Sequence, residues 1–242
     1  MPKVDGATAE WRQIARNDDV LYSITSWPDK RGRWTDADFY ASGEADWKDF
    51  RSQWQHFAPD LGGTCVEIGC GAGRLTKPLS GFFERVVALD VSEEMIARAA
   101  AVAGPNTDLV RVDRPVIPLA DGEADAVFTC HVLQHLETHA DFHTYLAEAH
   151  RSLRPGGTLM AHITLNSRRR SLPGRVVREL RLRWSRARLR RGRAHTAVRM
   201  RVYQQEQIFH LLSTELGFEE VELRAFPARS NGYLHHFFLA RL

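Results

Sequence analysis

The residues with the clearest chemical purpose are three alternating glycines in the stretch from Val66 to Leu75, which reads V-E-I-G-C-G-A-G-R-L. A short apolar run rich in β-branched residues precedes the glycines, and a pattern typical of a helix follows them. Glycines let a backbone approach a ligand without clashes from a Cβ atom, and a helix N-terminus offers free N–H groups. Glu67 stands at the expected strand end, where its carboxylate can receive a ligand ammonium or brace the loop. The stretch therefore predicts a strand, a tight ligand-binding turn and a helix.

Histidines supply the second candidate chemistry, because imidazole titrates near neutral pH and can accept a proton from a hydroxyl. Of the eleven histidines, His131, His135 and His162 fall at or just after the carboxyl ends of two expected strands, residues 125–130 and 159–164. Their placement makes all three candidates for a general base. Adjacent histidines close to the C-terminus, at 235 and 236, must point to opposite faces of a strand, so at most one of the pair reaches the same site.

The sequence shows no convincing set of metal ligands. His139 and His143 are spaced to share one face of a helix, but no nearby cysteine or carboxylate completes a set around them. The three cysteines, Cys65, Cys70 and Cys130, form no C-x-x-C pair and no zinc spacing. We therefore expect no metal site, and we expect reduced thiols in a cytoplasmic protein.

The spacing of the glycines distinguishes two kinds of cofactor loop. A nicotinamide-binding loop reads G-x-G-x-x-G, which would place its third glycine where Arg74 stands. Here the third glycine comes one residue earlier, at Gly73. An acidic residue followed by G-x-G-x-G resembles the first motif of the class I S-adenosylmethionine-dependent methyltransferases.

Four further stretches occur in the order that this family uses. Residues 90–95, D-V-S-E-E-M, resemble its second motif, and the expected strand over residues 109–113 ends in an aspartate, as the third motif does. Residues 132–136 read V-L-Q-H-L and residues 153–157 read L-R-P-G-G, and both resemble elements of the family closely. Together the five motifs are specific.

The resemblance implies S-adenosylmethionine as cofactor and S-adenosylhomocysteine as product. It implies that the Asp90 carboxylate accepts both ribose hydroxyls and that Met95 packs on the adenine ring. Asp113 would accept the adenine amino group, and the N–H of Arg114 would meet a ring nitrogen. The full set of expected cofactor neighbours is Glu67, Gly69, Cys70, Gly71, Gly73, Asp90, Val91, Met95, Asp113, Arg114, Cys130, Tyr40 and Gly43.

The implied fold is α/β, a doubly wound, seven-stranded and mostly parallel sheet of the Rossmann-like methyltransferase type, whose seventh strand is antiparallel. The resemblance is strong over residues 64–165 and loose over residues 203–242, where we expect an amphipathic helix closed by a glycine and then two strands. We divide the chain into a helical N-terminal cover (1–58), a cofactor-binding core (59–165), a basic helical cap insertion (166–202) and a C-terminal part of the core sheet (203–242).

The N-terminal cover contains most of the tryptophans. Its pattern predicts a short helix over residues 36–40, a turn at residues 42–44 and a second helix over residues 47–57. Bacterial methyltransferases carry a similar W…F-Y-x-x-G-E segment that closes over the methionine end of the cofactor. This resemblance is the reason for including Tyr40 and Gly43 among the cofactor neighbours.

The charge of the chain is strongly uneven. Residues Arg168 to Arg193 hold twelve arginines and one acidic residue, a net +11 in a chain of net +3, so the rest of the chain carries −8. The segment predicts a helix with one apolar stripe. Its arginines could contact phosphates of RNA, which is the minority hypothesis, or an anionic membrane surface; its stripe could cover the acceptor or a second subunit, as in a homodimer. A solvated lid packed on the acidic body is an equally supported interpretation.

These patterns together predict a soluble methyltransferase with no signal peptide and no transmembrane segment. We expect O-methylation of a hydroxyl on a small metabolite or a sugar-containing acceptor, with His135 as the first candidate for the base and His131 and His162 after it. Two alternatives stay open at this point. One is an N-methyltransferase, and the other is a non-catalytic relative that binds RNA or an anionic membrane through its arginine-rich helix.

Overall fold

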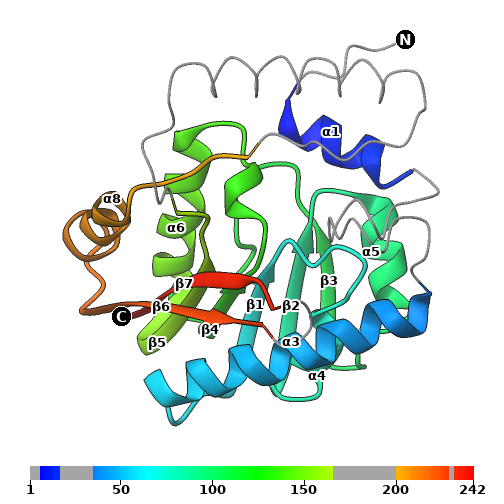
Figure 1. Ribbon diagram of the computed structural model, residues 1–242, viewed down its shortest axis with the longest axis horizontal. Coiled ribbons are helices and arrows are strands. Elements are labelled where there is room, and N and C mark those ends of the chain that lie inside the picture. The colour runs from blue at the N-terminus through cyan, green and yellow to red at the C-terminus, as the bar shows by residue number, and fades with distance from the viewer. Residues whose placement is uncertain (1–5, 17–34, 166–199, 229–231) are drawn as a thin grey trace.

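The computed structural model describes residues 6–16, 35–165, 200–228 and 232–242, and all structural statements below concern these residues. The arginine-rich segment Arg168 to Arg193, with the hypotheses attached to it, lies outside them. Figure 1 shows the arrangement of the elements. The helical elements are α1 (Ala7–Ile14), α3 (Asp36–Phe57), α4 (Thr76–Ser80), α5 (Glu93–Ala100), η2 (Leu133–His135), α6 (His139–Ser152), α8 (Gln205–Phe209) and η3 (His210–Glu215). The strands are β1 (Thr64–Ile68), β2 (Arg85–Asp90), β3 (Thr107–Arg111), β4 (Ala124–Thr129), β5 (Leu153–His162), β6 (Glu220–Pro227) and β7 (Leu234–Arg241).

The seven strands form one sheet in the order β3-β2-β1-β4-β5-β7-β6. Strands β1 to β5 pair in parallel, whereas β7 runs antiparallel to both of its neighbours. The predicted fold class, a doubly wound and mostly parallel sheet with an antiparallel seventh strand, is confirmed. The chain order reverses direction between β1 and β4, and in such sheets ligands bind beyond the carboxyl ends of the strands at this point.

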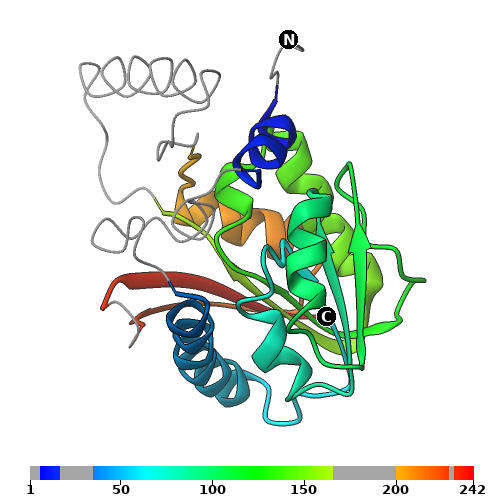
Figure 2. The same cartoon turned by 90° about the vertical axis from the view of Figure 1, so that its right-hand side faces the viewer.

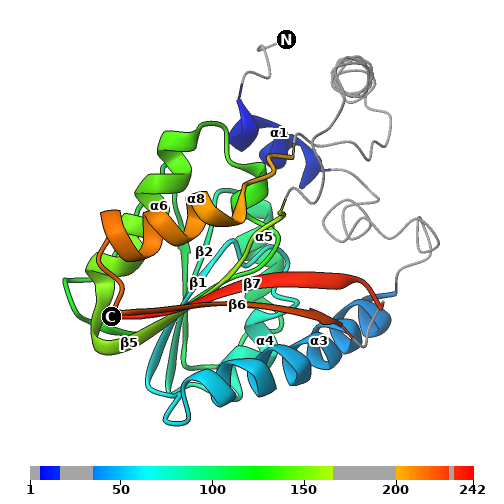
Figure 3. The same cartoon turned by 60° about the vertical axis from the view of Figure 1, so that its left-hand side comes forward.

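Helices cover both faces of the sheet, as expected for parallel strands that are buried on both sides. One apolar cluster joins alternate residues of the central strands to α6 and α8. The other joins the intervening residues to α3 and α4, and its centre is a group of aromatic rings around Trp54 and Phe128. The indole N–H of Trp54 donates to the hydroxyl of Thr158 on β5 at 3.0 Å, so the α3 helix is anchored to the sheet by a buried hydrogen bond as well. Figure 3 shows the two helical layers on opposite sides.

The predicted break in the N-terminal cover is wrong. Residues 36–57 form a single helix of 22 residues, α3, which the side chain of Thr35 caps by accepting from the N–H of Asp38. Gly43 lies inside this helix rather than in a turn. A Cβ atom there would stand 2.1 Å from the carbonyl oxygen of Arg74, so the glycine allows α3 to pack directly against the glycine loop.

Most other bounds follow the prediction within two residues. Strand β5 differs, because it begins at Leu153, where it pairs with Ala124, rather than at residue 159. The predicted C-terminal helix is present as α8 followed by the π-helical turn η3, and Gly217, at φ 83°, follows it. None of the helices in the described part of the chain is long and apolar enough to span a membrane.

Candidate active site

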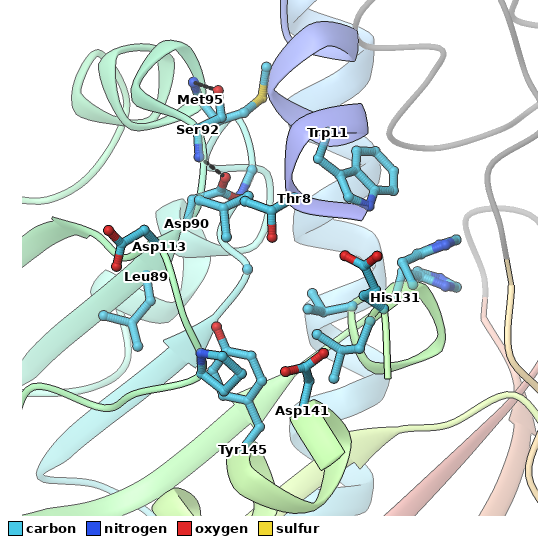
Figure 4. A pocket seen from close by; sticks show the side chains of 18 of the residues that line it. Thr8, Trp11, Leu89, Asp90, Ser92, Met95, Asp113, His131, Asp141 and Tyr145 are labelled. Carbon is cyan, nitrogen blue, oxygen red and sulfur yellow. Dashed lines mark hydrogen bonds between the residues drawn. The ribbon is translucent and has the colours of Figure 1, made fainter. Parts of the chain in front are cut away.

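A cavity of about 390 Å³ opens beyond the carboxyl ends of β1, β2 and β4. Residues of α1, of α6 and of the loop after β3 contribute to its walls, and Figure 2 shows α1 from the side. Figure 4 shows side chains from these separate elements converging on the cavity. Ten of the residues that were expected to contact the cofactor or the acceptor line this cavity: Gly69, Gly71, Asp90, Val91, Met95, Asp113, Arg114, Cys130, His131 and His135.

The glycine loop follows β1 and bends sharply across the end of β2. The N–H groups of Gly69 and Cys70 both donate to the carbonyl of Leu89, at 2.7 and 2.8 Å. The three glycines have φ values of 79°, 55° and 84°, which other residues rarely adopt. At Gly73 the requirement is also spatial, since a Cβ atom would stand 3.0 Å from the Cα of Ala99 on α5. Gly73 and Cys70 thus shape the loop from behind and do not line the cavity.

Asp90 ends β2 and points its carboxylate into the cavity (Figure 4). One carboxylate oxygen accepts from the N–H of Gly71 and the other from the N–H of Ser92, each at 2.9 Å. Burial raises the pKa of this carboxyl, and the backbone hydrogen bonds oppose that shift. Each oxygen keeps further acceptor capacity. The carboxylate is therefore held rigidly and can still accept hydrogen bonds from two adjacent hydroxyls.

An apolar wall and two polar groups lie beside Asp90. Ser92 caps α5 by accepting from the N–H of Met95, and this cap fixes the start of the helix whose Met95 side chain lines the cavity. Asp113 and Arg114, in the loop after β3, also line the cavity. Strand β3 ends at Arg111, two residues before Asp113, whereas the prediction ended it at Asp113. This part of the cavity offers a flat apolar surface with an acidic acceptor at its edge.

Glu67 is buried at the end of β1 and does not line the cavity. Its carboxylate accepts a hydrogen bond of 2.6 Å from the hydroxyl of Thr76, the first residue of α4. Burial raises the pKa of Glu67 to about 7, and the Thr76 hydrogen bond opposes this shift. Of the two predicted roles, the contact supports the brace, because it ties the strand before the glycine loop to the helix after it.

Tyr40 and Gly43 also lie behind the loop rather than on the cavity wall. The hydroxyl of Tyr40 donates to the carbonyl of Ala72 at 3.0 Å, and a buried ion pair of 2.6 Å joins Arg74 to Asp46 on α3. Along with the close packing at Gly43, these contacts clamp α3 onto the loop. In this structure, then, the segment around Tyr40 positions the loop and does not close over the cavity.

The three candidate base histidines differ in position. His131 and His135 line the cavity, and the ring of His135 meets Trp11 of α1 edge-on at 5.1 Å. His162 does not line it and is only 6% exposed, packed instead against His131 with ring centroids 4.2 Å apart. Burial lowers the pKa of His131 well below its usual value and that of His162 to about 3, and neighbouring histidines add to both shifts. Both rings are neutral and only weakly basic.

Some residues of the site were missed by the sequence analysis. Thr8 and Trp11 on α1 line the cavity, whereas the sequence placed the tryptophans of this region only in a general helical cover. Asp141 and Tyr145 on α6 also line it, one turn apart on the same helix face (Figure 4). The helix itself was expected within one residue of its observed bounds, and the capping box at Thr138, in which Asp141 takes part, marks its start.

The comparisons with known proteins agree with this geometry. Residues 66–161 match the model of a family described as a methyltransferase domain. These residues therefore carry a methyltransferase domain.

Curated relatives align with this chain over only part of their own length. A ubiquinone biosynthesis O-methyltransferase of Caulobacter vibrioides is 35% identical over 133 residues, covering 52% of this chain and 51% of that protein. A trans-aconitate 2-methyltransferase of Azoarcus sp. is 38% identical over 110 residues, covering 44% and 41%. The chain spans only about a third to a half of the curated relatives that it matches.

Solved structures resemble nearly the whole chain. Magnesium protoporphyrin IX methyltransferase from Synechocystis, solved with bound S-adenosylhomocysteine, superposes with a TM-score of 0.58 at 18% identity, covering 92% of this chain and 97% of that one. A phosphoethanolamine N-methyltransferase of Haemonchus contortus, also holding S-adenosylhomocysteine, gives a TM-score of 0.60 at 16% identity, covering 92% and 60%. At such identities these likenesses show the fold.

Proposed function

We propose that this protein transfers a methyl group from S-adenosylmethionine to a hydroxyl on a small metabolite or a sugar-containing acceptor. The single observation that carries the cofactor half of this proposal is the Asp90 carboxylate, buried at the end of β2 and held in the cavity by the N–H groups of Gly71 and Ser92. A fixed acceptor of this kind suits the two adjacent hydroxyls of a ribose.

The rest of the cavity fits the remaining parts of the cofactor. Met95 and Val91 provide an apolar wall for a purine ring, and Asp113 provides an acceptor for its amino group. The backbone of Gly69 and Gly71 forms the wall where the methionine end would lie. Glu67, Tyr40 and Gly43 contribute indirectly, because they hold the glycine loop in place.

The chemistry asks little of the protein besides positioning and the exclusion of water. When bound, S-adenosylmethionine supplies a methyl group that its sulfonium charge already activates. Helix α1 covers the cavity with Thr8 and Trp11, and Arg12 ties the helix down by donating to the carbonyl of Val91 at 2.9 Å. The covering helix therefore limits water at the place where the acceptor must lie in line with the transferred methyl group.

His135 is the best-placed base for an acceptor hydroxyl. It lines the cavity near the end of β4, and its ring rests against Trp11. His131 lines the same wall, but its low pKa makes it a weak base, since proton transfer is most effective when the pKa lies near the working pH. His162 is not among the described residues that line the cavity, so we do not place it at the acceptor.

The cofactor half of the proposal is tested by calorimetric titration with S-adenosylhomocysteine. Asp90→Asn keeps the size of the side chain but removes its charge and one acceptor, so we expect at least a tenfold weaker affinity, about 1.4 kcal/mol. Asp108→Asn is the matched control, because Asp108 is an exposed acid on β3 that pairs with Arg85 away from the cavity. Unchanged binding by Asp90→Asn would refute the ribose role, and no binding by the wild type would refute the proposed cofactor.

The acceptor half needs a transfer assay. Wild-type protein with radiolabelled S-adenosylmethionine is screened against hydroxylated metabolites, sugars and amines of matched size. Label incorporated into a hydroxyl acceptor, with loss of transfer in His135→Gln, supports the proposal. Transfer to amines alone, independent of His135, would instead establish the N-methyltransferase alternative.

A further inference from the structure

Three histidines from distant parts of the sequence meet at one edge of the sheet. His131 follows β4, His162 ends β5, and His235 is the second residue of β7. Their ring centroids lie 4.2 Å apart for the first two and 5.2 Å from His235 to each of the others. One ring nitrogen from each can be chosen so that all three lie within 4.8 Å of one another. Within the described residues, no hydrogen bond joins any two of these rings, so hydrogen bonding among them does not explain the grouping.

Two of these rings are buried and carry ring nitrogens without hydrogen-bond partners. His162 is 6% exposed and His235 is 3% exposed. Within the described residues, Nδ1 of His162 and both ring nitrogens of His235 have no partner. Buried polar atoms are nearly always paired, and leaving one unpaired costs about 1–3 kcal/mol. Three unpaired nitrogens in one place are therefore an unusual cost for a fold to carry unless something binds them.

The backbone at His131 carries a second cost. His131 has φ 61° and is the only non-glycine residue with positive φ in the described ranges. Such strain usually persists where it places a functional side chain. Here it turns the ring toward His162, and Gln134 holds that ring through a contact of 3.3 Å between its amide nitrogen and Nδ1. Because Gln134 engages Nδ1, Nε2 is the nitrogen of His131 available to a ligand.

The Gln134 amide also suits this arrangement in its reversed orientation. Amide nitrogen and oxygen are assigned from their surroundings, and the oxygen of Gln134 is buried with no described partner. With the amide reversed, Nδ1–H of His131 donates to that oxygen. Histidine ligands of metals commonly donate their other N–H to such an acceptor, which fixes the tautomer and the ring orientation.

The surroundings are apolar and nearly balanced in charge. Phe50 packs against His235, and Phe237 packs against His162. The charges that act on His235 are those of Asp46 and Arg74, which form a partly buried ion pair of 2.6 Å and shift its pKa in opposite directions. Burial lowers the pKa of all three histidines, and neighbouring rings of the cluster add to the shift at His131 and His162.

We propose that His131, His162 and His235 bind one zinc ion at the edge of the cavity. Three neutral imidazoles suit zinc, and sites with three protein ligands keep a fourth position open. Zinc–nitrogen bonds of about 2.0–2.1 Å place tetrahedral ligands roughly 3.3 Å apart, so nitrogens that now lie within 4.8 Å of one another approach by up to about 1.5 Å around the ion. Since His131 also lines the cavity, the open position faces it. No metal-ligand spacing in the sequence joins these three histidines, which is why the sequence predicts no metal site.

Direct metal binding tests this site independently of methyl transfer. Protein without an affinity tag is stripped with a chelator, dialysed and titrated with zinc chloride against a competing chromophoric chelator. We expect one zinc per chain, and at least a tenfold weaker affinity in His162→Gln and in His235→Gln. His143→Gln is the matched control, because His143 is half-exposed on α6 and contacts Glu215. Absence of stoichiometric binding, or equal affinity in all variants, would overturn the proposal.

A stability measurement separates loss of metal from loss of fold. Replacing His235 with leucine removes two unpaired nitrogens, so the stripped His235→Leu protein should melt at the same temperature as the stripped wild type or higher. Zinc should raise the melting temperature of the wild type and not that of the variant. If zinc stabilises both equally, the ion binds elsewhere and the proposal fails. His131→Asn provides a further test, since asparagine tolerates the positive φ at this position.

Discussion

Glu67 provides a quantitative test of how the glycine loop is held. The side chain is 3% exposed, and its carboxylate accepts a hydrogen bond from Thr76. In Glu67→Gln the amide oxygen can accept the same hydrogen bond, while the charge is removed. The substitution therefore isolates the free-energy cost of ionising a carboxyl at this buried position.

The sign of the effect follows from the raised pKa. Glu67 has a pKa of about 7 in the fold, against a usual value of 4.5, chiefly because of burial. Between these values the unfolded chain loses the proton while the folded protein retains it, so the free energy of unfolding of the wild type falls as the pH rises. Each pKa unit corresponds to about 1.4 kcal/mol, which gives a total of about 3 kcal/mol, of which about 2.5 kcal/mol falls between pH 5 and pH 8.

The assay is urea unfolding followed by tryptophan fluorescence at pH 5, 6, 7 and 8. The free energy of unfolding of Glu67→Gln minus that of the wild type should rise by about 2.5 kcal/mol across this range and then level off. Glu84→Gln removes an exposed carboxylate and serves as the control, with a difference within about 0.5 kcal/mol at each pH. A flat difference for Glu67→Gln would refute the reasoning, because it would mean that burial does not penalise the ionised form.

Two further substitutions test the packing of α3 and the choice of base. Gly43→Ala should lower the melting temperature, because overpacking costs about 1–3 kcal/mol and the new Cβ would meet the Arg74 carbonyl; Gly81→Ala, which has ordinary contacts, is the control. A rise in melting temperature for Gly43→Ala, as helix propensity alone predicts, would contradict the close contact. His135→Gln should lower kcat about 10²–10⁴-fold without changing the affinity for S-adenosylhomocysteine, and an unchanged kcat would assign the proton transfer elsewhere.

The sheet could be predicted because its strands carry a strong local signal. The strands β1, β2 and β4 are short apolar runs, each followed by a polar or glycine-rich turn, and parallel strands buried on both faces produce such runs. The break predicted in α3 shows where local signals fail. A glycine between a serine and a glutamate is typical of a turn. Here the glycine is needed because the backbone of Arg74 packs closely against it. These two residues are 31 positions apart, so no local pattern reveals the contact.

The part of the site formed by residues at the ends of strands could be predicted from the sequence. Asp90 is such a residue, and its position in the cavity follows directly from the position of β2. The other wall could not be predicted in the same way. Helix α1 is far from the core strands in sequence, and the contacts that place it, Arg12 to Val91 and Arg16 to Glu94, join residues 79 and 78 positions apart.

The histidine cluster depends on the direction of a single strand. In the sheet register, Ala161 of β5 pairs with Thr129 of β4, and His162 pairs with Phe237 of β7. Because β7 runs antiparallel, its first residues lie at the edge where β4 and β5 end; a parallel β7 would have brought its last residues there instead. Alternation along the strand then puts His235 on the same face as Phe237, beneath α3, and its neighbour at position 236 on the other face. Only the combination of strand direction and alternation singles out His235, so a cluster that no sequence spacing reveals follows from the topology of the sheet.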